Sequence, residues 1–316
     1  MRALVVLLTL VVACIGAVRA RPQQPAAVPQ PPEPTVQLTP AEIEIYKSAH
    51  TLIDWSPREI RKCPFLQKLR PARSQDQLPM VLERAGQAVA LLFHDFPRIA
   101  CDEVVVSEAS AGAPRGTLRG TKLHRFRYIA IPRSLGDFQG FEEYRTDLKG
   151  NRADAASLSD FFMITSNFIS TCLYLSPADQ RASRFRLFGI QPIREQKCHV
   201  VGFAQEPERV RRISMFKFRD QHDVVLVQGL AWIDFETFQI LRITTWLLAP
   251  RIDVSLSSHT STVDFYPVRP RGSERVLWLP RDVTVVTNYR GIRFSNAHHY
   301  SNFKLFRVES AIKPAE

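Results

Sequence analysis

The sequence lacks the short motifs that mark the common catalytic sites. It contains no Gly-x-Ser-x-Gly elbow, no His-Glu-x-x-His pair and no Cys-x-x-Cys pair. It also has no glycine-rich phosphate loop, no regular alternation of strands with helices and no repeat of fixed period. These absences lower the prior for an enzyme without excluding one, because catalytic residues can meet from distant loops.

Histidine and cysteine are too scattered to suggest a metal site. His298 and His299 are the only adjacent histidines among eight, and neighbouring residues of a strand point to opposite faces of a sheet. The cysteines are isolated along the chain, whereas a zinc site needs ligands in short pairs. The sequence therefore predicts neither a metal nor another cofactor.

The N-terminal apolar run is too short for an ordinary transmembrane helix. It extends from Ala3 to Val18, follows Arg2 and precedes the small residue Ala20, which is the pattern of a cleavable signal peptide over residues 1–20. We expect export to the periplasm or the extracellular space. Residues 11–14, Val-Val-Ala-Cys, offer an alternative as a lipobox, which would anchor the chain through an acylated Cys14.

Proline dominates the next segment. Seven of the twenty residues from Arg21 to Pro40 are proline, which fixes φ and lacks an amide donor. We expect a disordered, extended linker over residues 21–40 and a single α+β domain over 41–316. That domain is expected to have a helical part at 41–97 and an antiparallel sheet at 98–316.

Two helix signals lie in the helical part. Thr39-Pro40-Ala41-Glu42 has the composition of a capping box with proline in the first turn. From Leu78 to Phe96, apolar residues recur at spacings of three and four, which places them on one stripe that must be buried. Pro97 is expected to end this helix.

Beyond residue 98 the chain reads as short strands separated by turns, and the central hairpin is expected at 224–248. Its first arm is almost continuously apolar, so both of its faces should be covered. Its second arm alternates: one face is expected to carry Leu241, Ile243 and Leu247, and the other Arg242 and Thr244. The pattern predicts a strongly curved antiparallel meander whose concave face is covered by the N-terminal helices. The candidate covers are the 78–96 helix and the Phe161–Leu173 segment.

Four cysteines remain after a signal peptide is removed: Cys63, Cys101, Cys172 and Cys198. In an oxidising compartment they allow three sets of disulfide pairs. The favoured set joins Cys63 to Cys101, which would tie the helical part to the first strand. It also joins Cys172 to Cys198.

Positive charge is in excess. The formal net charge is +11, and removal of Arg2 and Arg19 with the signal lowers it by two to +9. Three arginine clusters lie near expected strand ends, at 181–186, 209–212 and 269–275. They are explained as solvated hairpin tips, or alternatively as docking points for an anionic membrane surface. Nucleic acid is not an expected partner, because no aromatic-basic recognition motif is present.

The stretch from Val200 to Val308 resembles a group of uncharacterised secreted bacterial proteins. Its motifs are Trp232-Ile233-Asp234, then Thr237 and Ile240-Leu241-Arg242, with "LWLPRDVTVV" and "HHYSNFKLF" further on. More distantly, the strand pattern is similar to periplasmic lipoprotein carriers and sensors of the LolA and RseB kind. The resemblance implies an unclosed barrel, a strongly curved antiparallel sheet whose hollow is plugged by helices and can hold acyl chains.

Three functional hypotheses follow. The first is a non-enzymatic envelope protein that binds a lipid-like or amphiphilic ligand, or an envelope partner, in the hollow of the sheet. The second is a structural or protein-interaction module with a filled core, and the third is a hydrolase whose residues meet only in three dimensions. The candidate ligand-binding residues are Phe161, Phe162, Phe168, Trp232 and Trp246.

Overall fold

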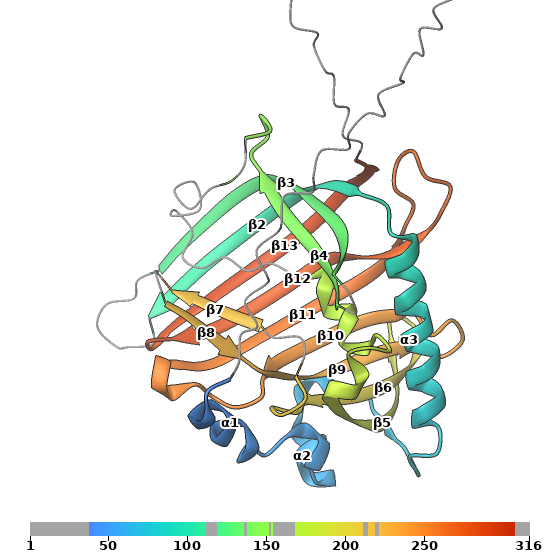
Figure 1. Ribbon diagram of the computed structural model, residues 1–316, viewed down its shortest axis with the longest axis vertical. Helices are drawn as coiled ribbons and strands as arrows, with labels where there is room; N and C mark the ends of the chain where they lie inside the picture. The colour runs from blue at the N-terminus through green and yellow to red at the C-terminus, as the bar shows by residue number, and fades with distance from the viewer. Residues whose placement is uncertain are drawn as a thin grey trace, which may run out of the picture. The chain divides into compact units, whose positions relative to one another are not determined.

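A computed structural model describes residues 38–111, 119–135, 138–151, 153, 168–210, 214–218 and 221–306 (Figure 1). The candidate residues Phe161 and Phe162 lie outside this described part. The helical elements are α1 (Pro40–Lys47), η1 (Leu52–Asp54), α2 (Pro57–Lys62), η2 (Pro64–Leu66), α3 (Leu78–Asp95), η3 (Ile169–Leu175), η4 (Gln180–Ala182) and η5 (Ile252–Val254). No helix among these residues is long and apolar enough to cross a lipid bilayer.

The strands of the N-terminal half are β1 (Arg70–Pro71), β2 (Ile99–Ala111), β3 (Arg119–Leu135), β4 (Phe138–Thr146), β5 (Ser183–Ile193) and β6 (Gln196–Gln205). Those of the C-terminal half are β7 (Ser214–Phe218), β8 (Gln221–Val225), β9 (Val227–Asp234), β10 (Ile240–Leu247), β11 (Leu256–Val268), β12 (Leu277–Tyr289) and β13 (Ile292–Leu305).

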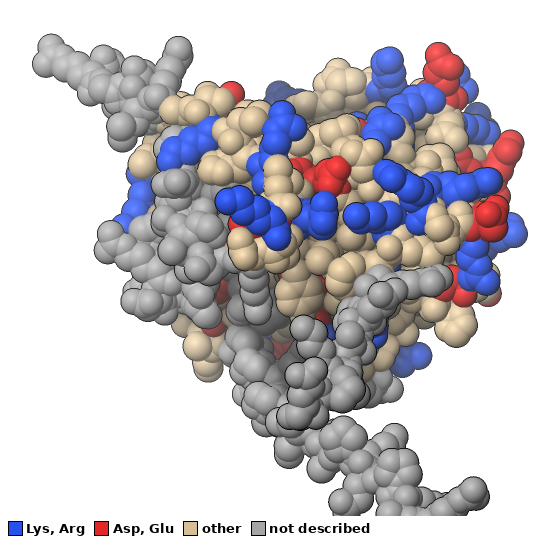
Figure 2. All heavy atoms as spheres, turned by 90° about the horizontal axis from the view of Figure 1, so that it is seen from above, with Lys and Arg blue, Asp and Glu red and all other residues tan. Residues whose placement is uncertain are grey.

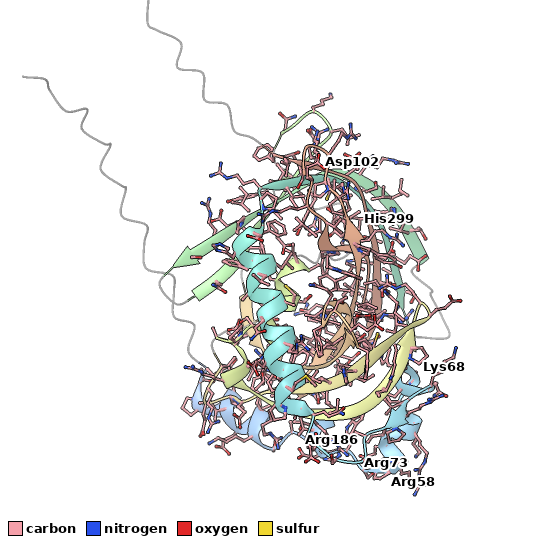
Figure 3. All side chains as sticks on the ribbon, turned by 90° about the vertical axis from the view of Figure 1, so that its right-hand side faces the viewer. Arg58, Lys68, Arg73, Asp102, Arg186 and His299 are labelled. Atoms are coloured by element: carbon pink, nitrogen blue, oxygen red, sulfur yellow. The ribbon has the colours of Figure 1, made fainter. Side chains whose placement is uncertain are left out.

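Eleven strands form one unclosed antiparallel sheet, as the sequence predicts (Figures 1 and 3). The strand order is β1-β5-β6-β9-β10-β11-β12-β13-β2-β3-β4, and β7 pairs only with β8. The sheet is not one continuous meander, since β2 pairs with the last strand, β13, over residues 292–305. The strands β2, β3 and β4 are therefore added to the sheet beyond β13, the last strand of the chain.

Local sequence explains the helices. The expected capping box of α1 is confirmed: Glu42 N donates to Thr39 Oγ1 at 3.3 Å, and Thr39 N donates to Glu42 Oε2 at 2.9 Å. Ser56 and Glu59 cap α2 in the same way. The long helix α3 begins at Leu78 as expected and ends at Asp95, two residues before Pro97.

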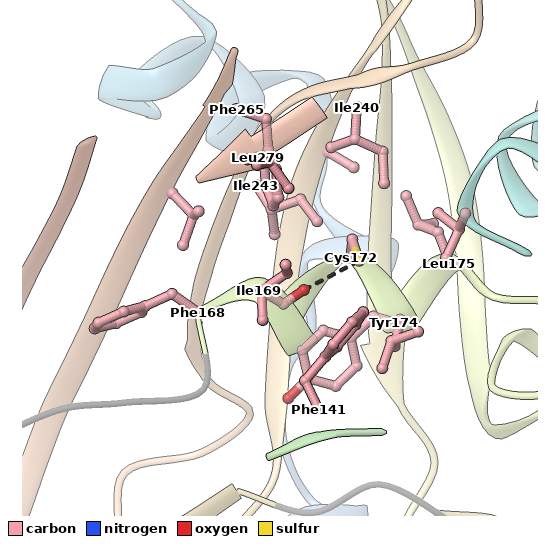
Figure 4. Packing of buried hydrophobic residues seen from close by; sticks show 14 of the residues in the cluster. Phe141, Phe168, Ile169, Cys172, Tyr174, Leu175, Ile240, Ile243, Phe265 and Leu279 are labelled. Carbon is pink, nitrogen blue, oxygen red and sulfur yellow. Dashed lines mark hydrogen bonds between the residues drawn. The ribbon is translucent and has the colours of Figure 1, made fainter. Parts of the chain in front are cut away.

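The sheet has two faces, and helical elements pack on both of them. Val201, Ala231 and Ile243 share a buried cluster with α3 and η3, and we call their side of the sheet the α3 face. Figure 4 shows η3 in this cluster, where Cys172 Sγ donates to the Ile169 carbonyl at 3.0 Å. Val200 and Trp232 point the other way and pack with Leu52, Cys63 and Leu66 of the N-terminal segment, on the α2 face.

The N-terminal helices therefore do not form one cover, and their expected role of covering the concave face as a group is not shown. Instead, α3 packs on one face while η1, α2 and η2 pack on the other. Figure 3 shows α3 and α2 on different sides of the curved sheet.

The central hairpin is formed by β9 and β10. Every residue of β9 is buried, as expected for a strand covered on both faces. The expected alternation in β10 fails at one position, because a β-bulge between Ile240 and Arg242 places Leu241 in the α2-face cluster and leaves Ile243 in the α3-face cluster.

Among the described residues the four cysteines form no disulfide, and all four are buried. Cys63 and Cys198 lie in the α2-face cluster, whereas Cys101 and Cys172 lie in the α3-face cluster. Each favoured pair would have to bond through the sheet, which corrects the disulfide framework expected from the sequence.

Candidate functional site

A buried carboxylate is the centre of the most polar region inside the fold. Glu103 of β2 has no exposed surface. Arg145 donates to both of its oxygens, at 2.6 Å from Nε and 2.7 Å from Nη2. His298 Nδ1 lies 2.9 Å from Oε1, and the Tyr300 hydroxyl donates to the same oxygen at 2.8 Å. We call these four residues the Glu103 cluster.

Strand register brings these residues together from distant parts of the chain. Tyr300 of β13 lies directly opposite Glu103 of β2, and His298 is two residues before Tyr300 on the same face of the sheet. On the other side of β2, Tyr128 of β3 lies opposite Arg145 of β4. The cluster thus depends on the pairing of the C-terminal strand with β2.

Electrostatics keep Glu103 ionised. Burial by itself raises the pKa of this carboxyl group, but the charge of Arg145 and hydrogen bonds from His298 and Arg145 outweigh burial and hold the pKa at about 2. Burial also lowers the pKa of His298 against the opposing effect of Glu103, so its imidazole is neutral at pH 7. Burial raises the pKa of Tyr300 well above its ordinary value.

The cluster is therefore a fixed charge pair with neutral hydrogen-bonding neighbours. A carboxylate with a pKa of about 2 and three donors on its two oxygens is a poor proton acceptor at neutral pH. It is well suited to hold the phenol and imidazole groups in place beside whatever occupies the adjoining space. The hydrolase hypothesis gains no support from Glu103.

An apolar pocket adjoins the cluster on the α3 face. Its lining includes Phe96, Ile99, Tyr128, Phe168, Leu279 and Tyr300. Phe168 also contacts His298 edge-on, with 4.8 Å between ring centroids. The volume is about 10 Å³, which is room for about one water molecule. The pocket is closely packed in this structure.

A row of polar side chains crosses the α3 face four residues further along β2 than Glu103. Ser107 of β2 is opposite Asn296 of β13, and Ser261 of β11 follows in the same row beyond Val285 of β12. The hydroxyls of Ser107 and Ser261 are buried and have no hydrogen-bond partner among the described residues. Buried hydroxyls without a hydrogen-bond partner are typical of a surface that receives water or a polar ligand group.

The structure separates the residues that the sequence suggested for ligand binding. Phe168 lies in the α3-face cluster and lines the apolar pocket. Trp232 and Trp246 lie in the α2-face cluster, where the Trp246 ring stacks on Trp55 at 6.0 Å and on Phe65 at 6.3 Å between centroids. The two tryptophans hold the N-terminal segment on the sheet and do not meet Phe168.

Sequence reasoning missed the Glu103 cluster. A signal was present, because Glu103 alternates with Cys101, Val105 and Ser107 on one face of β2 and all of these are buried. A carboxylate in the buried phase of a strand needs a partner. The partner could not be named without knowing that β13 pairs with β2.

No metal site is present among the residues that the structure describes, since no three His, Cys, Asp or Glu side chains are grouped to hold an ion. His298 and His299 behave as strand neighbours do: His298 is buried against Glu103, while His299 lies on the exposed face and bonds Asp282 at 2.7 Å.

Together, the unclosed sheet and its α3 face define a curved antiparallel-sheet protein with helices packed against it. No protein-family model matches the chain, and no curated protein matches it in sequence. Solved structures do match it. One is a DUF1329 family protein from Desulfovibrio piger, with 12% identity, a TM-score of 0.41, and coverage of 74% of this chain and 95% of that one.

Two further structures belong to the carrier group suggested by the sequence. A putative outer membrane lipoprotein-sorting protein domain from Vibrio parahaemolyticus has 10% identity, a TM-score of 0.39, and coverage of 74% of this chain and 94% of its own. A LolA superfamily protein from Nitrosomonas europaea has 12% identity, a TM-score of 0.31, and coverage of 73% and 94%. At these identities and scores the likenesses carry neither a family nor a function to this chain, and the unclosed antiparallel sheet rests on the structure itself.

Proposed function

We propose that this protein is a non-enzymatic, exported envelope protein that binds a lipid-like or amphiphilic ligand on the α3 face of its sheet. One observation supports this most directly: an apolar pocket adjoins a buried charge pair through Tyr300, and the same face of the sheet carries unsatisfied buried hydroxyls further along its strands. An amphiphile needs an apolar surface for its tail and polar groups for its head. The N-terminal signal pattern supports export.

Binding requires the packed side chains to move, because the pocket has room for only about one water molecule. Phe168 is the side chain whose displacement would open the pocket toward the Glu103 cluster, since it contacts both. The tail would then lie against Phe96, Ile99 and Leu279, and the head near Ser107.

The tight packing also favours a second candidate, a structural or protein-interaction module in which this region is simply core. The pocket beside Tyr300 and a second one between Val89, Cys172 and Phe265 each have a volume of only about 10 Å³. On this alternative the partner is another envelope protein that binds the outside of the domain, and the buried hydroxyls carry water.

Native mass spectrometry separates the two candidates. The protein is purified gently from an envelope fraction, and anything bound is extracted with organic solvent. A stoichiometric lipid or other amphiphile is the expected result. A clean mass of the protein alone, from several preparations, would contradict ligand binding and favour the interaction module.

A pair of matched variants locates the site. Phe168→Ala enlarges the pocket, whereas Phe188→Ala removes an equally buried ring from the α2 face. Binding of a fluorescent fatty acid, measured by titration, should change for Phe168→Ala and stay as in the wild type for Phe188→Ala. Equal effects of both variants would argue against a site on the α3 face.

A further inference from the structure

A run of basic side chains follows the outside of the N-terminal segment. Six exposed cations lie within residues 58–73. They are Arg58, Arg61, Lys62, Lys68, Arg70 and Arg73, which we call the basic rim. Figure 3 shows Arg58, Lys68 and Arg73 on the same side of the molecule, near Arg186.

No described residue neutralises the charges of the basic rim through an ion pair. None of the six forms an ion pair with another described residue. Glu59 is the only acidic residue between 57 and 73, and it is held by the α2 cap and by His50 at 2.9 Å. The nearby Asp54 is paired with Arg184 at 3.0 Å.

The three arginine clusters suggested by the sequence behave differently. Arg184 and Arg186 bind the N-terminal segment, Arg209 pairs with Glu206 at 3.0 Å, and Arg275 pairs with Asp95 at 2.7 Å. Several cations of those clusters thus bind partners within the protein. The six cations of the basic rim, in contrast, have no such partner among the described residues.

The backbone that carries the basic rim is held firmly. Gln191 Nε2 donates to the Phe65 carbonyl at 3.0 Å, Ala72 N donates to the Phe188 carbonyl at 2.8 Å, and β1 pairs with β5. This backbone is already ordered by folding, so docking does not lose its conformational entropy again, and the cations form a prearranged surface.

We infer that the basic rim docks the domain on an anionic lipid bilayer. The six cations are spread along helix, turn and strand instead of converging on a pocket, which suits many separate head groups and not one bound phosphate. The nearby aromatic rings of Trp55 and Phe65 stack on Trp246, so docking is electrostatic without insertion of these rings. The surface begins eighteen residues after Pro40, where the expected linker ends.

The test is co-sedimentation of the mature chain with vesicles. Phosphatidylcholine vesicles with a one-third share of phosphatidylglycerol should bind the protein, and pure phosphatidylcholine vesicles should not. Raising the salt to about 1 M should abolish binding, because the Debye length falls to about 3 Å. Binding that survives this salt concentration, or that ignores the anionic lipid, would overturn the inference.

Positive charge is present on other faces as well (Figure 2). Two variants of equal net charge therefore test whether vesicle binding depends on the basic rim or only on the total charge of the protein. The first changes Arg58, Arg61, Lys68 and Arg73 to Gln. The second changes Arg98, Arg125, Arg271 and Arg293 to Gln, which are exposed and have no ion pair with another described residue.

The first variant should bind anionic vesicles at least roughly tenfold more weakly, and the second should bind nearly as the wild type does. Unchanged thermal unfolding in both variants shows that the fold is kept. Equal losses in both variants would contradict docking through the basic rim. Binding of the wild type to an acidic polypeptide such as polyglutamate, but not to vesicles, would contradict docking on a lipid bilayer. Ligand extraction from the α3 face is a separate readout, so either proposal can fail alone.

Discussion

At the scale of single residues, Glu103 places the strongest demand on the fold. A buried carboxylate is tolerated only when its charge is paired and its oxygens are hydrogen-bonded. Arg145, His298 and Tyr300 meet that demand from two other strands. Removing the carboxylate charge leaves the Arg145 guanidinium buried without its partner.

We expect Glu103→Gln to lower the free energy of unfolding by about 3 to 5 kcal/mol, as for other broken buried pairs. Urea unfolding followed by circular dichroism measures the change. Glu206→Gln is the matched control, because it removes a carboxylate from the surface pair with Arg209 and should cost less than about 1 kcal/mol. A similar cost for both variants would show that burial of Glu103 is not what matters.

His259 gives the stability its expected dependence on pH. Burial lowers the pKa of this residue to about 4, while an unfolded histidine has a pKa of about 6.5. Between these values the unfolded chain binds a proton that the folded chain does not, so the free energy of unfolding falls as the pH drops. The loss is at most roughly 3 kcal/mol and is complete near pH 4. Burial lowers the pKa of His298 and His199 too, which adds loss in the same direction.

Urea unfolding at steps from pH 7.5 to pH 4.5 tests this expectation. His259→Gln should flatten the pH dependence, whereas His94→Gln, at an exposed position at the end of α3, should leave it unchanged. Equal losses of stability in His259→Gln and the wild type as the pH falls would contradict this role of His259.

At the scale of elements, the β9–β10 hairpin depends on close contact between backbones. Gly229 lies where an added Cβ atom would be 2.5 Å from the Thr244 carbonyl oxygen and 2.9 Å from the Phe203 ring. Neither atom is the end of a flexible side chain. A side chain at this position therefore has to push two central strands apart.

We expect Gly229→Ala to destabilise the protein by about 1 to 3 kcal/mol, in spite of the entropy that alanine removes from the unfolded chain. Thermal unfolding measures the loss. Glu236→Ala, at an exposed position in the turn of the same hairpin, should stay within about 0.5 kcal/mol of the wild type. A neutral Gly229→Ala variant would mean that the strands can separate at little cost.

Sequence patterns predicted several elements well and failed where long-range contacts decide. The α1 capping box and the fully buried β9 depend on neighbouring residues, and both are confirmed. The α3 helix is confirmed too, but its buried face includes Val81 and Phe93, while Leu78, Leu82 and Leu92 of the expected stripe are only half-buried. The β10 alternation failed because a bulge depends on the partner strand. The disulfide pairs failed because sequence spacing does not show on which face of the sheet a cysteine lies.

At the scale of the whole molecule, the N-terminal segment from Leu38 to Arg73 packs across the α2 face, and we call it the strap. Leu52, Cys63 and Leu66 are buried there against Trp232 and Leu230. Arg251 is almost fully buried near the start of the strap and bonds Tyr46, the Val224 carbonyl and Asp253. The strap therefore closes a second core.

Deleting residues through Arg73 should expose this second core. We expect the truncated protein to lose several kcal/mol of stability, because burying each of Leu52 and Leu66 contributes about 1.5 to 3 kcal/mol. It should also bind a dye that fluoresces on apolar surfaces. Deletion through Gln37 leaves the strap in place and should change neither property. Dye binding equal to that of the wild type after the longer deletion would show that the strap is dispensable.

The sequence by itself determined the helix caps, the position of the α3 helix and the antiparallel class of the sheet, because each depends on residues close together in the chain. Only the tertiary structure decided the Glu103 cluster, the separation of Phe168 from Trp232 and Trp246, and the faces of the sheet on which the four described cysteines lie. The physical reason is the pairing of β13 with β2, which brings Tyr300 to Glu103, and the opposite facing of neighbouring strand residues. Both depend on strand register, which is settled by the packing of the whole sheet.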